Sequence, residues 1–229
     1  MSTKNLSDLA YKHISGELLN GQLTPGQKIS EPVLAKELGI SRTPVREAIQ
    51  RLQNEGLLQQ VPSSGTYVAQ TSRVPLIETY EIRLALETMA VRKVAQRIRP
   101  RDLPKLKKCC QRMKSVITTM QKKKVDNIEG NLLVKFLNAD LDFHLTIMRL
   151  ADNRMALKLI TDAHMRNRIF GYLCRHRDLA HAGGTLNVHS SIVKAIADHN
   201  ADAAYKLLRE HIELSMTEAL EVLDEKDYK

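Results

Sequence analysis

One stretch decides the fold of the N-terminal part of this chain: Ser41-Arg42-Thr43-Pro44-Val45-Arg46-Glu47-Ala48-Ile49-Gln50-Arg51-Leu52. Its apolar residues recur at i, i+3, i+4 and i+7, at Val45, Ala48, Ile49 and Leu52. This period places them on one face of a helix, where they can be buried. Ser41 suits the N-cap, and Pro44 falls in the first turn, where a missing N–H costs little. Arg42, Arg46 and Gln50, spaced by four, then line the opposite face.

The segment before this helix predicts a second one that meets it through a tight turn. A short helix is expected after Ser30, and Gly39 suits the position just beyond its C-terminus. Only Ile40 separates Gly39 from Ser41, so the two helices form a helix-turn-helix. A further amphipathic helix is predicted over residues 6–20.

The segment after it predicts a β-wing. Residues 57–61 and 66–69 have the composition of short strands, and Pro62-Ser63-Ser64-Gly65 joins them. We therefore predict a winged helix-turn-helix domain over residues 1–73.

The rest of the chain, residues 74–229, is predicted to be all α. Six amphipathic windows follow one another, at 75–97, 101–122, 128–150, 153–176, 185–199 and 202–224. Breaks are expected at Pro100, near Gly130, at Asp152-Asn153, at Gly183-Gly184 and at His199-Asn200. The predicted fold class is mainly α, with a winged helix-turn-helix followed by a bundle of about six helices.

Charge and composition narrow the class of protein. The net charge of +9 fits a nucleic-acid partner, but residues 1–73 carry 8 basic against 6 acidic residues, only +2. Residues 92–124 carry 13 basic residues and one acid, Asp102. We interpret this run as a solvated helix face, with an auxiliary phosphate-binding surface as the alternative.

The same composition argues for a cytoplasmic protein. No apolar run approaches 18 residues and no signal-peptide pattern is present, so no membrane partner is expected. The three cysteines, Cys109, Cys110 and Cys174, lack a CxxC spacing, so neither a disulfide framework nor a thiolate zinc site is indicated.

Taken together, these residues resemble the GntR family of bacterial transcriptional regulators. The resemblance rests on Pro25-Gly26, Ser30-Glu31, Leu34-Ala35, Leu38-Gly39, the run Ser41–Ala48, Leu52, Gly56-Leu57 and Gly65. The helical remainder resembles the FCD effector-binding domain of the FadR subfamily, in its shorter, VanR-like branch. That second resemblance rests on Arg83, Glu87, Asp140, Phe143-His144, Asn153, His189, Ala204 and His211-Ile212.

The first resemblance implies a DNA-binding surface. Arg42 and Arg46 are expected at bases or phosphates, with Ser41 and with Thr43 or Pro44 at the DNA backbone. Arginine to guanine is the commonest specific contact in a major groove. The alternative is an exposed face on which both arginines pair with Glu31 or Glu47.

The wing is expected to contribute less than in many relatives. The resemblance implies that the tip at Ser64 and Gly65 enters the minor groove. Two departures from the family make recognition depend heavily on Arg42 and Arg46: Pro32 stands near a DNA-contacting arginine of some relatives, and Ser63-Ser64 replaces basic residues often found at the tip.

Four residues form a candidate metal site. Asp140 and His144, four apart, share one helix face. His189 and His211 each lie 11 residues from the turn expected at Asn200, so an antiparallel hairpin brings them side by side. The resemblance implies that all four bind one divalent transition metal, with Zn²⁺ the first choice and Ni²⁺, Mn²⁺ or Fe²⁺ as alternatives. The competing interpretation is four separate core or surface histidines and acids. Val188 replaces a common glutamate, which suggests a lost polar group beside the site.

A small organic acid is the effector that the resemblance implies. Arg83 is the candidate partner for its carboxylate, because Arg83 shares a helix face with apolar residues. The alternative is an ion pair of Arg83 with Glu87 at i+4.

The predicted function is a ligand-responsive regulator, a repressor or an activator, that binds an inverted-repeat operator as a homodimer. Two alternatives remain at this point: a metal sensor, in which the ion itself is the signal, and a metal-dependent hydrolase.

Overall fold

The computed structural model describes residues 3–170 and 178–227, with side chains from 5 to 170 and from 178 to 224. The chain forms two compact units. The N-terminal unit comprises Met1–Ser72 with Met165–Gly171, and the helical unit comprises Arg73–His164 with Tyr172–Lys229. Cys174 and the end of the window predicted at 153–176 lie outside the described residues.

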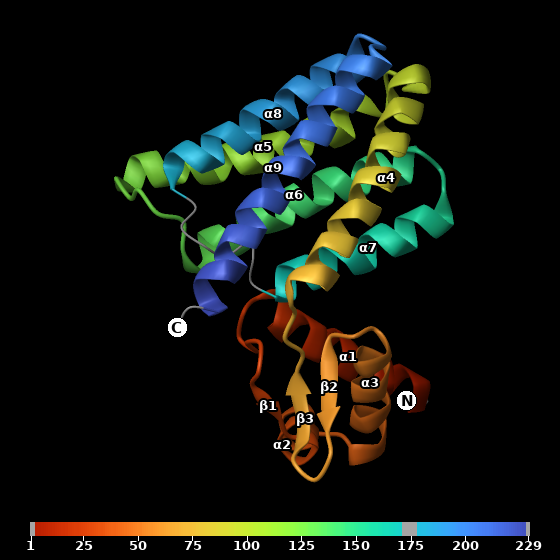
Figure 1. Cartoon of the computed structure of the whole chain (residues 1–229), viewed down its shortest axis with the longest axis vertical. Coiled ribbons are helices and arrows are strands. Elements are labelled where there is room, and N and C mark those ends of the chain that lie inside the picture. Colours follow the sequence, from red (N-terminus) through yellow and green to blue (C-terminus); the bar gives the residue numbers. More distant parts are fainter. Residues whose placement is uncertain (1–2, 171–177, 228–229) are drawn as a thin grey trace. The chain divides into compact units, whose positions relative to one another are not determined.

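The N-terminal unit is the predicted winged helix-turn-helix (Figure 1). Its elements are α1 (Thr3–Leu19), β1 (Lys28–Ile29), α2 (Glu31–Leu38), α3 (Arg42–Asn54), β2 (Leu58–Val61) and β3 (Gly65–Val68). The three strands pair antiparallel, with β3 in the centre. Strand β1 was not predicted from the sequence, because two residues are too few to show an alternating pattern.

The core of this unit forms where α3 packs on α1. Four apolar side chains of α3 are buried as the period predicts, Val45, Ala48, Ile49 and Leu52. They meet a buried face of α1 that contains Ala10, Ile14 and Leu18. Each large aliphatic side chain buried in this way contributes roughly 1.5–3 kcal/mol. Because that face is committed to the core, the opposite face of α3 is left exposed.

The turn between α2 and α3 depends on Gly39. Its φ of +65° is left-handed, and its N–H donates to carbonyl oxygens of α2. A side chain at this position would be strained, which explains the glycine. Ser30 and Ser41 occupy the predicted N-cap positions, but neither side chain makes a capping hydrogen bond.

The helical unit, together with the segment that begins at Met165, contains six described helices, in agreement with the predicted number. They are α4 (Arg73–Arg97), α5 (Leu103–Lys123), α6 (Gly130–Leu150), α7 (Arg154–Ile169), α8 (Leu179–Ala197) and α9 (Ala201–Asp227). Helix α4 packs against α9, α6 and α8, while α5 packs against α6 and α8 (Figure 1). Tyr80, Phe136 and Phe143 are among its largest fully buried side chains. The mainly α fold class is thus confirmed.

The break predicted at Gly183-Gly184 is wrong, because both glycines lie within α8. The helix begins earlier, where the Asp178 carboxylate accepts a hydrogen bond of 2.7 Å from the N–H of His181. This cap satisfies a free N–H of the first turn and holds the helix start upstream of the glycines. The isolated pairing of Asn127 with Asp178 is the one bridge outside the named strands in the described ranges.

The described residues bear on three of the predictions from composition. Among the described residues, no helix is long and apolar enough to cross a membrane. Cys109 and Cys110 are free thiols. Three lysines of the basic run lie near the start of α5 and are exposed, which fits a solvated face: Lys105, Lys107 and Lys108. Asp102 Oδ1 lies 2.7 Å from Lys105 Nζ.

Candidate nucleic-acid interface and metal centre

The exposed face of α3 carries the predicted DNA-contacting residues. Arg42, Thr43 and Arg46 are exposed, as is Ser41 just before the helix. Pro44 differs, because its ring is buried with the apolar face. This burial limits what the proline side chain can contact from outside.

Arg46 adopts the arrangement that the sequence analysis considered as the alternative. Its Nη2 lies 3.2 Å from Oε2 of Glu31, at the start of α2. The Arg46 side chain is nevertheless 65% exposed. An exposed ion pair contributes only about 0–1 kcal/mol, so it does not remove Arg46 from an approaching anion.

The tip of the wing is a tight turn in which two residues have a left-handed backbone conformation. Ser63 has a φ of +59° and Gly65 a φ of +128°, both left-handed. The Ser64 and Tyr67 hydroxyls lie 2.6 Å apart, which fixes the Ser64 side chain across the hairpin. The Ser64 hydroxyl at the tip is therefore already hydrogen-bonded to Tyr67.

Lys28 supplies a cation to the wing that the sequence analysis missed. A side-chain carbon built on Gly65 would lie 3.0 Å from Lys28 Cε, so the exposed lysine runs alongside the tip. The ammonium group also lies 5.8 Å from the centre of the Tyr67 ring. The signal was absent from the sequence because Lys28 reaches the tip only through the pairing of β1 with β3.

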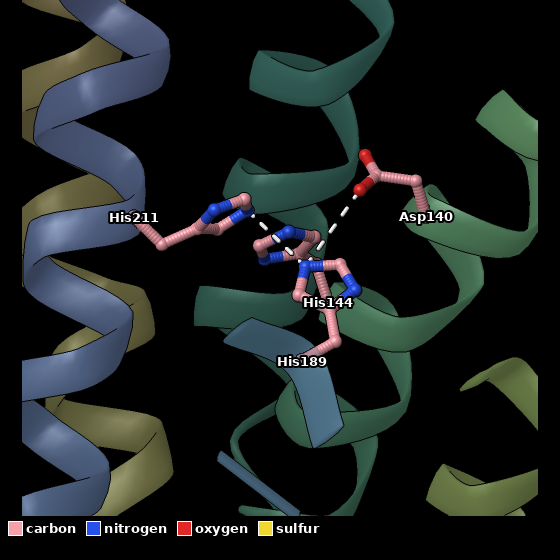
Figure 2. A group of neighbouring side chains, drawn as sticks. All are labelled: Asp140, His144, His189 and His211. Atoms are coloured by element: carbon pink, nitrogen blue, oxygen red, sulfur yellow. Dashed lines mark hydrogen bonds and ion pairs between the residues drawn. The ribbon is translucent and has the colours of Figure 1, made fainter. Parts of the chain in front are cut away.

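In the helical unit, the four predicted metal ligands converge (Figure 2). Asp140 and His144 lie on α6, His189 on α8 and His211 on α9. One donor atom from each residue lies within 4.8 Å of all the others. The two Nε2 atoms of His189 and His211 are 3.1 Å apart, and Asp140 Oδ1 is 3.7 Å from His189 Nε2. Donors that share one zinc ion are about 3.4 Å apart, so these separations fit a single ion.

Burial and orientation also fit a metal. His144 and His189 are 1% and 0% exposed. His189 stacks on Phe143, with ring centres 4.1 Å apart, which fixes the plane of its imidazole. His144 Nε2 is buried and has no hydrogen-bond partner among the described residues, although a buried polar atom normally has one. A metal ion would supply the missing partner.

The local electrostatics favour a neutral imidazole at His211. Burial, with the neighbouring His189 and His144, holds the pKa of His211 well below its ordinary value. A histidine must be deprotonated to bind a metal, so this environment leaves the ligand ready at neutral pH.

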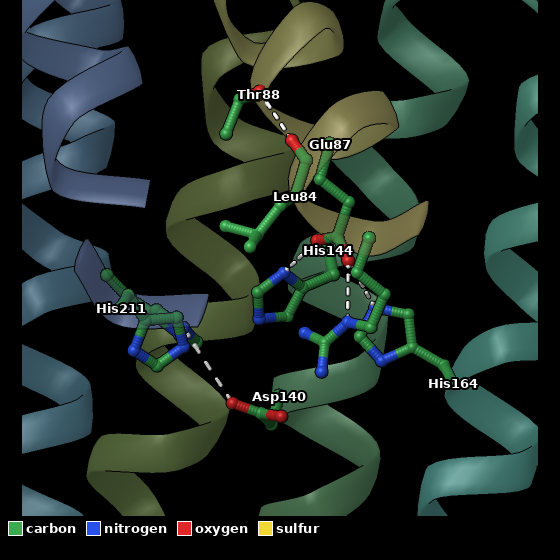
Figure 3. Close-up of polar contacts among 9 residues, drawn as sticks. Leu84, Glu87, Thr88, Asp140, His144, His164 and His211 are labelled. Carbon is green, nitrogen blue, oxygen red and sulfur yellow. Dashed lines mark hydrogen bonds and ion pairs between the residues drawn. The ribbon is translucent and has the colours of Figure 1, made fainter. Parts of the chain in front are cut away.

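A buried polar cluster lies directly behind His144 (Figure 3). The Glu87 carboxylate on α4 is 2.5 Å from His144 Nδ1, 2.8 Å from Arg83 Nε and 3.0 Å from His164 Nε2. Burial alone would raise the pKa of Glu87, but Arg83 and the two imidazoles hold it well below its usual range. Burial and the Arg83 charge lower the pKa of His164 to about 4, so His164 is neutral at pH 7.

Part of this cluster was predicted from the sequence. Arg83 pairs with Glu87, as the alternative prediction had it, and both are buried. The contact of His164 with Glu87 was not predicted, since the two residues are 77 positions apart. The contact of Glu87 with His144, 57 residues apart, was likewise not predicted. Neither contact has a signal in local spacing.

A pocket of about 270 Å³ adjoins the metal-ligand set. It is lined by Asp140, His181, Gly184, Thr185, Val188, His211, Leu214, Ser215 and Glu218. Asp140 and His211 thus face both the other ligands and the pocket. Arg83 is not among the lining residues.

The comparisons with known proteins agree with this architecture. A family model described as "FCD domain" matches residues 78–214, and one described as "Bacterial regulatory proteins, gntR family" matches residues 6–68. The chain is 28% identical to the Nta operon transcriptional regulator of Aminobacter aminovorans over 200 residues, which are 87% of each protein.

Two further matches are a relative that is similar over part of the sequence and a solved structure with a similar fold. An uncharacterized HTH-type transcriptional regulator from the TAR-I ttuE-ttuC' intergenic region of Agrobacterium vitis is 32% identical over 142 residues, 62% of this chain and 78% of that protein. The solved structure of E. coli McbR/YncC superposes with a TM-score of 0.76 over 100% of both chains, at 23% identity. This last likeness is one of fold.

Proposed function

We propose that this chain, which belongs to the GntR family of bacterial transcriptional regulators and carries an FCD domain, binds an inverted-repeat operator as a homodimer. A small carboxylate and a bound metal modulate its affinity for DNA. The observation that carries the proposal is the exposed edge of α3, where Arg42 and Arg46 stand on a helix anchored by its buried face.

On DNA, α3 lies in the major groove. Arg42 and Arg46 contact base edges or phosphates, Ser41 and Thr43 contact the backbone, and Pro44 shapes the first turn. Ser64 and Gly65 approach the minor groove, with Lys28 beside them to pair with a phosphate. With a net charge of only +2 on residues 1–73, specific binding depends heavily on these few cations.

An inverted-repeat operator requires two reading heads related by a two-fold axis. A homodimer supplies them, and the spacing of the half-sites follows from the separation of the two α3 helices. The helical unit is the proposed dimerisation domain. The VanR-like branch remains a prediction.

Asp140, His144, His189 and His211 are the proposed ligands of a divalent transition metal, with Zn²⁺ as the first choice. Such an ion supplies a Lewis acid that a carboxylate can bind. The pocket of about 270 Å³ is large enough for a small acid, and Asp140 and His211 connect it to the metal ligands. A contact of the acid with Arg83 would require its ion pair with Glu87 to open.

The effector acts by shifting populations. An acid that binds one arrangement of the dimer better than another changes the fraction of molecules whose reading heads match the operator. Because the family consists of regulators rather than enzymes, the hydrolase alternative is set aside.

The test starts from an operator selected from random DNA by the purified protein. Fluorescence anisotropy then measures operator binding by metal-loaded protein, by chelator-treated protein and by metal-loaded protein with a panel of small acids. We expect an inverted repeat, and a change in affinity of about tenfold with one class of acid only when metal is present. Selection of no common DNA sequence would contradict the proposal.

The same experiment separates the remaining alternative. If chelation and metal restoration alone switch operator binding on and off, and no acid has an effect, the protein is a metal sensor.

A further inference from the structure

Glu87 is the centre of a closed set of buried contacts that reaches one metal ligand. Its two oxygens are divided among partners on three helices: Oε2 meets His144 Nδ1 of α6, while Oε1 meets Arg83 of α4 and His164 of α7 (Figure 3). Glu87 is 1% exposed, and Arg83 and His164 are 3% and 4% exposed. Water has little access to replace any of these partners.

This arrangement determines which nitrogen of His144 carries the proton. A carboxylate bound by a guanidinium accepts hydrogen bonds and does not donate them. At 2.5 Å from Glu87, His144 Nδ1 therefore donates, and the tautomer with one proton on Nδ1 has its lone pair on Nε2. This Nε2 is the buried atom without a hydrogen-bond partner among the described residues.

We propose that Arg83 and Glu87 form a positioning pair that holds His144 in the Nδ1–H tautomer and thereby sets the metal affinity of the site. The inference rests on the metal site of the proposed function. It gives Arg83 a role inside the protein: its charge keeps Glu87 an acceptor, and it stands 5.0 Å from the Tyr80 ring, which backs the guanidinium. Glu87, on α4, supplies a polar group behind the ligands even though Val188 precedes His189.

A second metal held by Glu87, His144 and His164 is the competing explanation, since their donor atoms also lie close together. The geometry disfavours it. Arg83 Nε already occupies Glu87 Oε1 at 2.8 Å, so an added cation would lie next to a permanent positive charge in a buried site. With Arg83 in place, the cluster is better suited to orient an imidazole than to bind an ion.

The first test measures zinc affinity by competition with a chromophoric chelator, without any organic acid. Loss of a carboxylate that orients a metal-bound histidine typically lowers metal affinity about 10–100-fold. We expect a loss in this range for Glu87→Gln, which preserves the size of the side chain. The matched control is Glu78→Gln, an exposed glutamate on the same helix, which should keep the affinity of the natural protein.

A second variant removes both charges together. Replacing a buried ion pair by apolar side chains is often tolerated, so Arg83→Met with Glu87→Met should fold even where Glu87→Gln does not. We expect the same loss of zinc affinity. If Arg83 served only an organic acid and Glu87 only the fold, zinc affinity would be unchanged in this folded variant, and the inference would be overturned.

A third measurement determines which nitrogen of the His144 ring carries the proton. This property would not change if Arg83 and Glu87 served only to stabilise the fold. Nitrogen-15 spectra of the metal-free natural protein should show the Nδ1–H tautomer, and spectra of the double variant should show a mixture or the Nε2–H form. An Nε2–H ring in the natural protein overturns the inference without any variant.

Failure of the proposed metal site gives a different result. If the natural protein takes up no zinc, the metal site itself is wrong. If it takes up zinc through His189 and His211 but the double variant binds equally well, only the positioning role of Arg83 and Glu87 is wrong.

Discussion

At the scale of single residues, the proposed function gives Arg46 and Lys28 different tasks on DNA. Arg46 projects from the helix that we propose faces base edges, and its exposed pair with Glu31 can be exchanged for a stronger contact with guanine or phosphate. Lys28 lies beside the wing, where a flexible ammonium group meets phosphates without regard to sequence. The two side chains can therefore be distinguished by how their loss affects specificity.

We predict that Arg46→Ala lowers operator affinity by about 1–3 kcal/mol, roughly 5–150-fold, and reduces discrimination against unrelated DNA. Lys28→Gln should instead weaken binding to operator and to unrelated DNA alike. It should also reduce the slope of log affinity against log salt concentration by about 1, the loss of one phosphate contact. Anisotropy titrations at several salt concentrations measure both effects. Unchanged operator affinity of a folded Arg46→Ala protein would refute the assignment of α3 as the reading helix.

The two neighbouring thiols are predicted to be unreactive. Burial raises the pKa of Cys109, and burial together with the adjacent Cys109 raises the pKa of Cys110 to about 11. Because the thiolate is the reactive form, alkylation of Cys110 at pH 8 should be on the order of a hundredfold slower than that of free cysteine, and should accelerate as pH rises toward 11. Peptide mapping after iodoacetamide treatment measures this. Complete modification of the native protein within minutes would contradict it, and protein unfolded in guanidinium is the positive control.

At the scale of elements, the start of α8 is set by an N-cap residue, although two glycines that disfavour a helix follow it. Asp178 starts the helix upstream of Gly183 and Gly184, so the glycines are retained inside it at a cost in backbone entropy. Nothing lies within 4 Å of a side-chain carbon added at Gly183. The second residue, Gly184, lines the pocket, which makes Gly183 the cleaner position to change.

We predict that Gly183→Ala stabilises the protein by about 0.5–1 kcal/mol, because alanine loses less freedom than glycine on entering a helix. The midpoint of thermal unfolding should rise by a few degrees. Gly130→Ala is the matched control: it also has open space, but its φ is +53°, so it should lower the midpoint. A fall of the midpoint for Gly183→Ala would indicate that α8 does not extend through this position.

At the scale of the whole molecule, the proposed metal ties three helices of the helical unit together, because its ligands come from α6, α8 and α9. An ion that binds only the folded state stabilises it in proportion to its occupancy. The stability of the chain and its metal content are therefore linked.

We predict that zinc at about 100 times its dissociation constant stabilises the protein by about 2.7 kcal/mol. For a chain of this size that corresponds to about 5–10 °C in the unfolding midpoint. The double variant His189→Ala with His211→Ala should contain no metal by elemental analysis and show no shift with zinc. His199→Ala, at the turn between α8 and α9, should retain both. Full metal content of the double variant would refute the site.

The features predicted correctly from the amino-acid sequence are those that depend on the spacing of neighbouring residues. The four-residue spacing of Arg42 and Arg46 predicted one exposed helix edge, and the equal distances of His189 and His211 from Asn200 predicted their meeting across a hairpin. Such predictions succeed because helix period and turn position are set by neighbours in the chain.

The contacts between distant segments depend on how the helices and strands pack together. Glu87 meets His144 and His164 across 57 and 77 residues, and Lys28 reaches Gly65 through a two-residue strand. These side chains carry no periodic signal toward each other, because packing of the bundle and the sheet sets their distances. The sequence thus determined which helices would form and which faces would be buried, and packing decided which polar groups would act together.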